Sequence, residues 1–306
     1  MADPHGFYTD TTVCIGCKAC QVACHQWNDL PAEGTQTGRL ELSVVLSVQS
    51  YDNTRSFSDV NWRHVKFIEQ INAERTEAAW LMMSDVCKHC AHAPCLEVCP
   101  TGAILRTEFD SVYINAPTCN GCRDCVAACP FGVIHMSERT HVAQKCTFCY
   151  DRLKEGLAPA CAQACPTKSI RFGTVRELKR VAEARVAQLH REGETKAHLY
   201  GADDKVLGGL NAFYLLVDTP ETYGLPSQPK VPSRGVPRSS LWSIFAAILT
   251  ALGVLFAFRD RTKKRPAAAG AAPTPRADAP GSPGPAPATA VNPNEAIREG
   301  PPEGHT

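Results

Sequence analysis

Cys119-Asn-Gly-Cys122-Arg-Asp-Cys125-Val-Ala-Ala-Cys129-Pro130 is the stretch of this sequence that decides the fold. Its spacing, C-x2-C-x2-C-x3-C-P, is a bacterial pattern for binding [4Fe–4S] clusters. The first three thiolates can hold three irons of one cubane, whereas the fourth cysteine ligates the other cluster in proteins that carry two. One such run therefore predicts a partner run elsewhere in the chain.

All 16 cysteines of the 306-residue chain fall into four sets of four. Set one is Cys14, Cys17, Cys20 and Cys24; set two is Cys87, Cys90, Cys95 and Cys99; set three is Cys119, Cys122, Cys125 and Cys129; set four is Cys146, Cys149, Cys161 and Cys165. Long stretches without cysteine separate the sets, which favours metal binding over a disulfide framework. Because thiolate sites take up metal as the protein folds, we expect assembly in the reducing cytoplasm.

Zinc is the competing metal for sets of four cysteines. Structural zinc sites use two C-x2-C pairs set well apart, and three closely spaced cysteines followed by Cys-Pro make a poor tetrahedral cage. The histidines His25, His89 and His92 lie close to the cysteines, but we do not expect them to be ligands because each set already offers four thiols. The sequence therefore predicts four [4Fe–4S] clusters with the sixteen cysteines as iron ligands.

An internal repeat supports this interpretation. The element Cys-Pro-x-x-x-Ile recurs at Pro100, Pro130 and Pro166, which predicts three helix ends that each lead into a strand. The segments 103–114 and 133–144 both have the pattern of a β-hairpin. A strand is also expected over residues 169–172.

The hairpin between set two and set three bears on how the sets exchange cysteines. Only this hairpin separates them, so we predict that they pair, and that set one pairs with set four. The predicted ligand groups are Cys14, Cys17, Cys20 with Cys165; Cys24 with Cys146, Cys149, Cys161; Cys87, Cys90, Cys95 with Cys129; and Cys99 with Cys119, Cys122, Cys125. A pairing of set one with set two and of set three with set four satisfies the spacing as well.

A cation stands close to each set in the sequence. These residues are Lys18, Lys88, Arg123 and Lys145. Nearby charge helps to set the reduction potential of a cluster, so one hypothesis is that these cations raise and stagger the four potentials. The alternative hypothesis is that they are solvated surface charges.

The expected fold class is α+β, with two ferredoxin-like bis-[4Fe–4S] units in one domain over residues 7–175. An insertion with strands occupies residues 25–86 of this domain. Within it, residues 40–48 and 65–69 favour strands. We assign the insertion no chemistry beyond the docking of a partner.

Residues 176–238 are expected to form a helix followed by a Gly/Pro-rich extension. Thr174 and Glu177 have the spacing of a capping box at the start of this helix. The extension contains one expected strand at residues 213–217.

The C-terminal part predicts a membrane anchor. Leu241–Phe258 is uncharged and mostly apolar, and as a helix it would be about 27 Å long, close to the roughly 30 Å of bilayer hydrocarbon. We place the transmembrane helix at residues 239–259. Residues 260–306 begin with basic residues and continue as a Pro/Ala-rich tail that is expected to be disordered.

Charge around this helix predicts its orientation. Five Lys/Arg closely follow Leu241–Phe258 and three precede it, so the C-terminus is expected in the cytoplasm and the clusters on the outer face of the membrane. The first ten residues lack the features of a signal peptide. Export is therefore expected to depend on a partner that carries a twin-arginine signal.

Several stretches resemble the iron–sulfur (beta) subunit of membrane-bound formate dehydrogenases. The resemblance runs from about residue 7 to residue 235 and is carried by segments 7–24, 145–152, 199–201 and 224–226. His25 departs from it, because the family has a lysine there.

The resemblance implies a fold, a function and partners. It implies an electron-transfer subunit that works with a molybdopterin-containing catalytic subunit, which holds molybdenum or tungsten and oxidises formate, and with a membrane cytochrome b-type subunit that passes electrons to quinone. It also implies that set one pairs with set four and set two with set three. The alternative is the equivalent subunit of another molybdopterin reductase or of a hydrogenase.

The remaining composition agrees with a subunit that is not catalytic by itself. The sequence contains no phosphate-binding loop, no nucleophile elbow and no spare metal-binding set. The net charge of +1 gives no reason to expect binding to nucleic acid.

Overall fold

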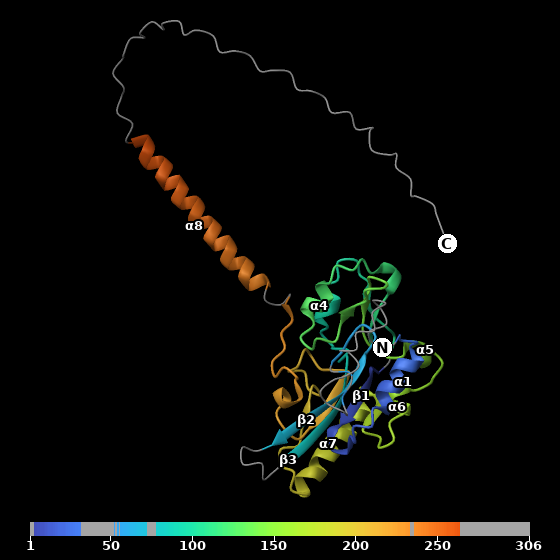
Figure 1. Ribbon diagram of the computed structural model, residues 1–306. Helices are drawn as coiled ribbons and strands as arrows, with labels where there is room; N and C mark the ends of the chain where they lie inside the picture. Colours follow the sequence, from blue (N-terminus) through green and yellow to red (C-terminus); the bar gives the residue numbers. More distant parts are fainter. Residues whose placement is uncertain are drawn as a thin grey trace, which may run out of the picture. The chain divides into compact units, whose positions relative to one another are not determined.

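The computed structural model describes residues 3–31, 52, 54, 56–71, 78–232 and 236–263. Residues 1–245 belong to one compact unit and residues 246–306 to another. The first unit mixes short helices with small sheets, as the α+β expectation required (Figure 1).

A four-stranded sheet ties the two ends of the first unit together. Its order is β8 (Ile170–Thr174), β1 (His5–Asp10), β10 (Ala212–Leu216) and β9 (His198–Tyr200). β1 is antiparallel to β8 and parallel to β10. β10 is buried along its whole length, which suits its run of apolar residues in the interior of the sheet. The extension strand expected at 213–217 is therefore part of this sheet, whereas β1 was not predicted.

Helix α7 (Val175–Arg191) packs against β1 and follows β8 directly (Figure 1). The Thr174 hydroxyl accepts a hydrogen bond from the Glu177 backbone N–H at 3.3 Å, which confirms the predicted cap. Leu178, Ala182 and Leu189 form the buried face of the helix.

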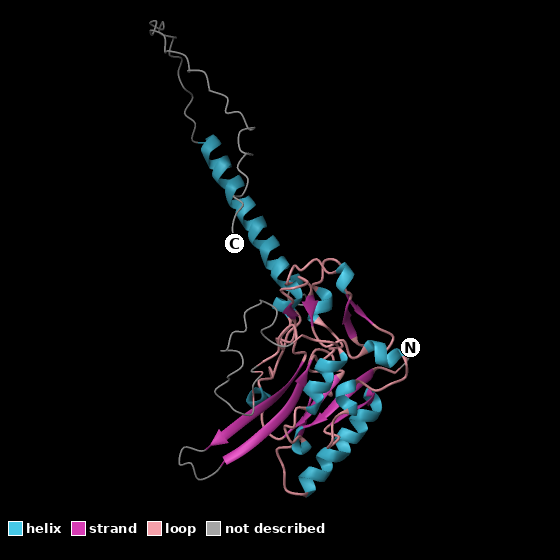
Figure 2. Ribbon diagram, turned by 45° about the vertical axis from the view of Figure 1, so that its right-hand side comes forward, coloured by secondary structure: helices cyan, strands magenta, loops and turns pink. Residues whose placement is uncertain are grey.

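The insertion contributes a long antiparallel hairpin of β2 (Arg63–Ile71) and β3 (Ala78–Val86), which Figure 2 shows as the two longest strands. The strand predicted at 65–69 is confirmed as part of β2. β3 was not predicted, because its Ala-Ala-Trp-Leu-Met-Met run lacks the alternation and the β-branched residues that signal a strand. The strand expected at 40–48 lies outside the described residues.

Two short hairpins occur at the places that the sequence predicted. β4 (Ile104–Arg106) pairs with β5 (Val112–Ile114), and β6 (His135–Met136) pairs with β7 (Ala143–Gln144). Short helices also occur along the first unit, several of them within or beside the cysteine sets. They are η1 (Thr11–Val13), α1 (Ala19–Trp27), α3 (Pro94–Glu97), η2 (Ala116–Thr118), α4 (Asp124–Ala128), α5 (Tyr150–Lys154), α6 (Ala160–Gln163) and η3 (Pro220–Tyr223).

Helix α8 (Val236–Lys263) is the apolar C-terminal helix that the sequence predicted. Ser240–Asp260 within it is long and apolar enough to cross a bilayer, and among the described residues it is the one such segment. The described side chains of this segment are exposed. The described residues end at Lys263, so the Pro/Ala-rich tail that was predicted to be disordered lies outside them.

The pairing of β1 with its neighbours depends on the absence of a side chain at Gly6. A Cβ atom there would overlap the Asn211 carbonyl oxygen and lie 2.8 Å from Val175 Cγ2. Gly173, which faces Gly6 across the β1–β8 pair, would meet only Leu178 at 3.8 Å.

We therefore expect Gly6→Ala to destabilise the protein by about 1–3 kcal/mol, because an added methyl group forces the backbone apart. Gly173→Ala is the matched control and should change stability far less. Thermal unfolding of the anaerobically purified variants measures both. Equal melting temperatures for the two variants would contradict this account.

Candidate metal-cluster sites

The cysteine loops turn through left-handed backbone conformations. In sets one and three the motif is C-x-G-C, and its glycines, Gly16 and Gly121, have φ of +66° and +75°. Lys18 and Arg123, the residues after the second cysteine, also have positive φ and precede α1 and α4. The same turn therefore occurs in both sets, as expected of a repeat.

Strand pairing decides which sets meet. Set one follows β1, and set four precedes β8. These two strands are antiparallel and Thr9 pairs with Ile170, so Cys14 and Cys165 lie at the same end of the β1–β8 pair. Set two precedes β4 and set three follows β5, where Ile104 pairs with Ile114. Each meeting of two sets thus depends on one antiparallel pair of strands.

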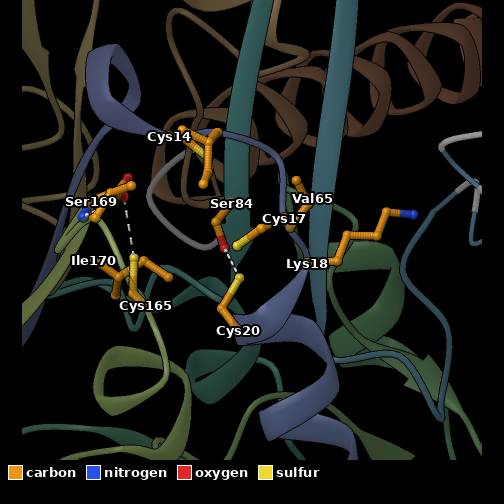
Figure 3. Close-up of a pocket in the computed structure, with 11 residues that line it drawn as sticks. Cys14, Cys17, Lys18, Cys20, Val65, Ser84, Cys165, Ser169 and Ile170 are labelled. Atoms are coloured by element: carbon orange, nitrogen blue, oxygen red, sulfur yellow. Dashed lines mark hydrogen bonds between the residues drawn. The ribbon is translucent and has the colours of Figure 1, made fainter.

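Cys14, Cys17, Cys20 and Cys165 line a cavity of about 290 Å³ (Figure 3). Cys20 Sγ lies 3.1 Å from Ser84 Oγ on β3. The side chain of Lys18 points away from this cavity in Figure 3, and its ammonium forms an ion pair with Asp52 at 2.9 Å.

Two further cavities have the same kind of lining. Cys87, Cys90, Cys95 and Cys129 line one of about 320 Å³. Cys99, Cys119, Cys122 and Cys125 line another of about 310 Å³. Four thiols thus line each of the three cavities.

The remaining cysteines, Cys24, Cys146, Cys149 and Cys161, are all buried. Burial and the neighbouring thiols of Cys146, Cys161 and Cys149 raise the pKa of Cys24 well above its usual value, so these four side chains lie together. Cys146 Sγ accepts a hydrogen bond from the Phe148 backbone N–H at 3.3 Å. The structure therefore brings twelve thiols together in three groups of four and buries the remaining four close to one another.

The donor chemistry of these groups fits the positively charged iron–sulfide core of a cluster. Burial raises the pKa of Cys20 to about 11 and that of Cys146 to about 12, and it raises the pKa of Cys95 to about 12. Such thiols become thiolates at neutral pH only beside a strongly positive group. Among the described residues, which include all sixteen cysteines, no three His, Cys, Asp or Glu side chains are placed to hold one metal ion.

The histidines near the cysteines make other contacts. His89 is fully buried, its Nδ1 accepts a hydrogen bond from the Val112 backbone N–H at 3.0 Å, and its ring centroid is 4.6 Å from that of Phe148. Burial and the charge of Lys145 hold the pKa of His89 well below its usual value. His25 Nε2 lies 3.1 Å from the Pro31 carbonyl oxygen.

The four cations beside the sets have different environments. Lys88 is buried and forms an ion pair with Asp85, whose other oxygen binds Lys66 at 2.8 Å. Lys145 is also buried, and its ammonium donates to the carbonyl oxygens of Val112 and Cys146. The surface-charge hypothesis is therefore wrong for Lys88 and Lys145, whereas Arg123 is exposed.

Sequence reasoning missed the polar residues of the β2–β3 hairpin. Arg63, Ser84 and Asp85 are all buried against the cysteine groups. Charged residues within a strand are usually interpreted as part of a solvent-exposed face, and Arg63 is 24 residues from the nearest cysteine in the sequence, Cys87. No local signal could have placed them here.

Comparison with known proteins agrees with this geometry. Two models of a 4Fe–4S dicluster domain match residues 13–103 and residues 78–175. Together they span the four cysteine sets.

Similar proteins extend the match to most of the chain. The chain is 38% identical over 253 residues to the iron–sulfur subunit of the nitrate-inducible formate dehydrogenase of Escherichia coli K12, covering 81% of this chain and 80% of that protein. It is 39% identical over 226 residues to the formate dehydrogenase iron–sulfur subunit of Haemophilus influenzae, covering 72% and 68%. It is also 40% identical over 169 residues to a thiosulfate reductase electron transfer subunit of Salmonella typhi, covering 55% and 74%. By its cysteine groups and by this similarity, the chain belongs to the family of formate dehydrogenase iron–sulfur subunits.

Proposed function

We propose that this chain is the electron-transfer subunit of a membrane-bound formate dehydrogenase and is not catalytic by itself. It would receive electrons from a molybdopterin-containing catalytic subunit, which holds molybdenum or tungsten, and pass them toward a membrane cytochrome b-type subunit and quinone. The observation that carries the proposal is the assembly of sixteen thiols into four groups within one compact unit.

Each thiol group would hold one [4Fe–4S] cluster, which when bound supplies a site for one electron. The proposed ligands are Cys14, Cys17, Cys20, Cys165 for cluster 1; Cys24, Cys146, Cys149, Cys161 for cluster 2; Cys87, Cys90, Cys95, Cys129 for cluster 3; and Cys99, Cys119, Cys122, Cys125 for cluster 4. The chain's part is to bury these groups and to fix their spacing.

Contacts between groups support an order from cluster 1 to cluster 4. Across groups, Cys161 raises the pKa of Cys20, Cys87 raises that of Cys146, and Cys125 raises that of Cys95. Cys17 and Cys122, in the first and last groups, are exposed. The two ends of the row are thus the places where redox partners can approach closely.

Cys129 allows the grouping to be tested, because it belongs to set three but is proposed to ligate cluster 3 together with cysteines of set two. In the proposed arrangement, Cys129→Ser and Cys95→Ser perturb the same cluster, so both variants should lose the same EPR signal and up to about four of 16 irons. Cys149→Ser is the control, and it should remove a different signal. If Cys129→Ser matched Cys149→Ser instead, set three would exchange with set four.

The function itself is tested on the complex purified anaerobically from membranes. It should contain about 16 iron and 16 labile sulfide per copy of this chain, and formate should reduce the clusters, measured by EPR and visible absorbance. The similarity to a thiosulfate reductase subunit makes that enzyme class the second candidate. Reoxidation by thiosulfate, with no reduction by formate, would select the second candidate. A colourless preparation without sulfide would exclude both.

We further propose that α8 is a single-pass anchor in the cell membrane, with the cluster domain on the outer face. The support is the apolar segment Ser240–Asp260 and the basic residues that follow it in the sequence. The molybdopterin-containing subunit would then carry the export signal for both chains.

A reporter that is active only in the cytoplasm, fused after Thr306, tests this orientation. We expect an active fusion, because five Lys/Arg closely follow the uncharged stretch Leu241–Phe258 and three precede it. An inactive reporter on a fusion that immunoblotting finds intact in the membrane would reverse the orientation.

A further inference from the structure

Arg63 is a fully buried cation at the start of β2, where it pairs with Val86 of β3. Its side chain is 1% exposed, and none of the ion pairs among the described residues includes it. Its guanidinium lies 5.0 Å from the ring centroid of Phe7, and its Nη1 donates to Ser84 Oγ at 3.0 Å. These contacts hold the group in place without neutralising its charge.

Two donors of the guanidinium have no partner in the protein. Nε and Nη2 of Arg63 are both buried and make no hydrogen bond. An arginine cannot lose its proton inside a protein, so burial cannot be relieved by neutralisation. A buried charge without a counter-charge is strongly unfavourable. The site therefore requires an anionic group that accepts hydrogen bonds.

Cysteines of the groups proposed for clusters 1 and 2 lie next to this strand, because Cys20 and Cys24 belong to α1, which packs against β2. Burial alone would lower the pKa of Arg63, but the thiolates of Cys161, Cys20, Cys146 and Cys24 outweigh it and raise the pKa. Cys20 belongs to the first group, and the other three belong to the second. Ser84 links the guanidinium to the first group, because its Oγ also lies 3.1 Å from Cys20 Sγ.

The other cations near the clusters are placed differently. Lys88 shares its charge with the buried carboxylate of Asp85, and Lys18 forms an ion pair with Asp52. Arg123 is exposed to solvent, where its field is screened. Arg152 and Lys145 are also buried, but Arg152 donates to Ala158 and Gln163, and Lys145 donates to two carbonyl oxygens. Among the described residues, Arg63 is therefore the buried guanidinium with N–H donors left without a partner in the protein.

We propose that Arg63 raises the reduction potentials of clusters 1 and 2, relative to clusters 3 and 4, by placing a fixed positive charge and free N–H donors beside both. This inference rests on the proposed function and its ligand groups. Reduction adds one negative charge to a cluster, so a nearby cation stabilises the reduced state and raises its potential.

The test is an EPR-monitored redox titration of the whole complex carrying Arg63→Gln. Clusters 1 and 2 are identified by the signals that Cys20→Ser and Cys149→Ser remove. We expect both potentials to fall by at least 59 mV, which for one electron corresponds to a tenfold change in the equilibrium constant for reduction. Clusters 3 and 4 should change much less. Arg63→Lys keeps the charge, so it should lower the two potentials less than Arg63→Gln does. The control is Arg171→Gln, which removes an exposed cation on β8.

Each outcome decides the question. The proposal would be overturned if a fully loaded Arg63→Gln complex kept the wild-type potentials of clusters 1 and 2. It would also be overturned if Arg171→Gln or Arg63→Lys lowered these potentials as much as Arg63→Gln. If Arg63→Gln fails to load iron while Arg63→Lys loads fully, the need for a cation between the two groups is supported. If Arg63→Gln and Arg63→Lys lose iron equally, the positive charge at residue 63 is not what the two groups need, and the proposal is overturned. The proposed function is judged separately, from the iron content and formate reduction of the wild-type complex.

Discussion

Buried negative charge is the constraint on which the rest of this structure depends. Sixteen thiols are gathered in four groups, most of them away from solvent, and each group must become anionic to hold a cluster. Burial by itself opposes this, because it raises the pKa of thiols such as Cys146 and Cys95. The interior therefore needs positive charge, and buried cations stand close to these groups at Arg63, Lys88 and Lys145.

The β2–β3 hairpin supplies much of that polar interior. Arg63 donates a hydrogen bond to Ser84, whose hydroxyl oxygen lies 3.1 Å from Cys20 Sγ. Asp85 forms an ion pair with Lys88, the residue that follows Cys87. Tyr214 of β10 donates a hydrogen bond to Asp85 at 3.0 Å, which joins the hairpin to the central sheet. The insertion thus contributes electrostatics to the cluster sites as well as a surface.

Much of this arrangement could be predicted from sequence because it is local. The C-x2-C spacing, the two short hairpins, the Thr174 cap and the apolar segment of α8 all depend on residues close in the chain. The missed features are non-local. β1 and β3 become strands through partners, and nothing near Arg63 in the sequence indicates that it faces Cys20 and Cys161. Arg63 is buried only because distant segments of the chain fold around it, and burial of this kind leaves no periodic pattern in the local sequence.

The place of β1 has a consequence for the order of events during synthesis. β1 begins at residue 5, yet it lies between β8 and β10, and β10 ends at residue 216. A chain that leaves the ribosome from its N-terminus must therefore wait for almost the whole first unit before this strand acquires both neighbours. Contacts between such distant segments form slowly, since a long loop must close first. We therefore expect the first cysteines to be made, which directly follow β1, to be enclosed only after β8 and β10 have been synthesised.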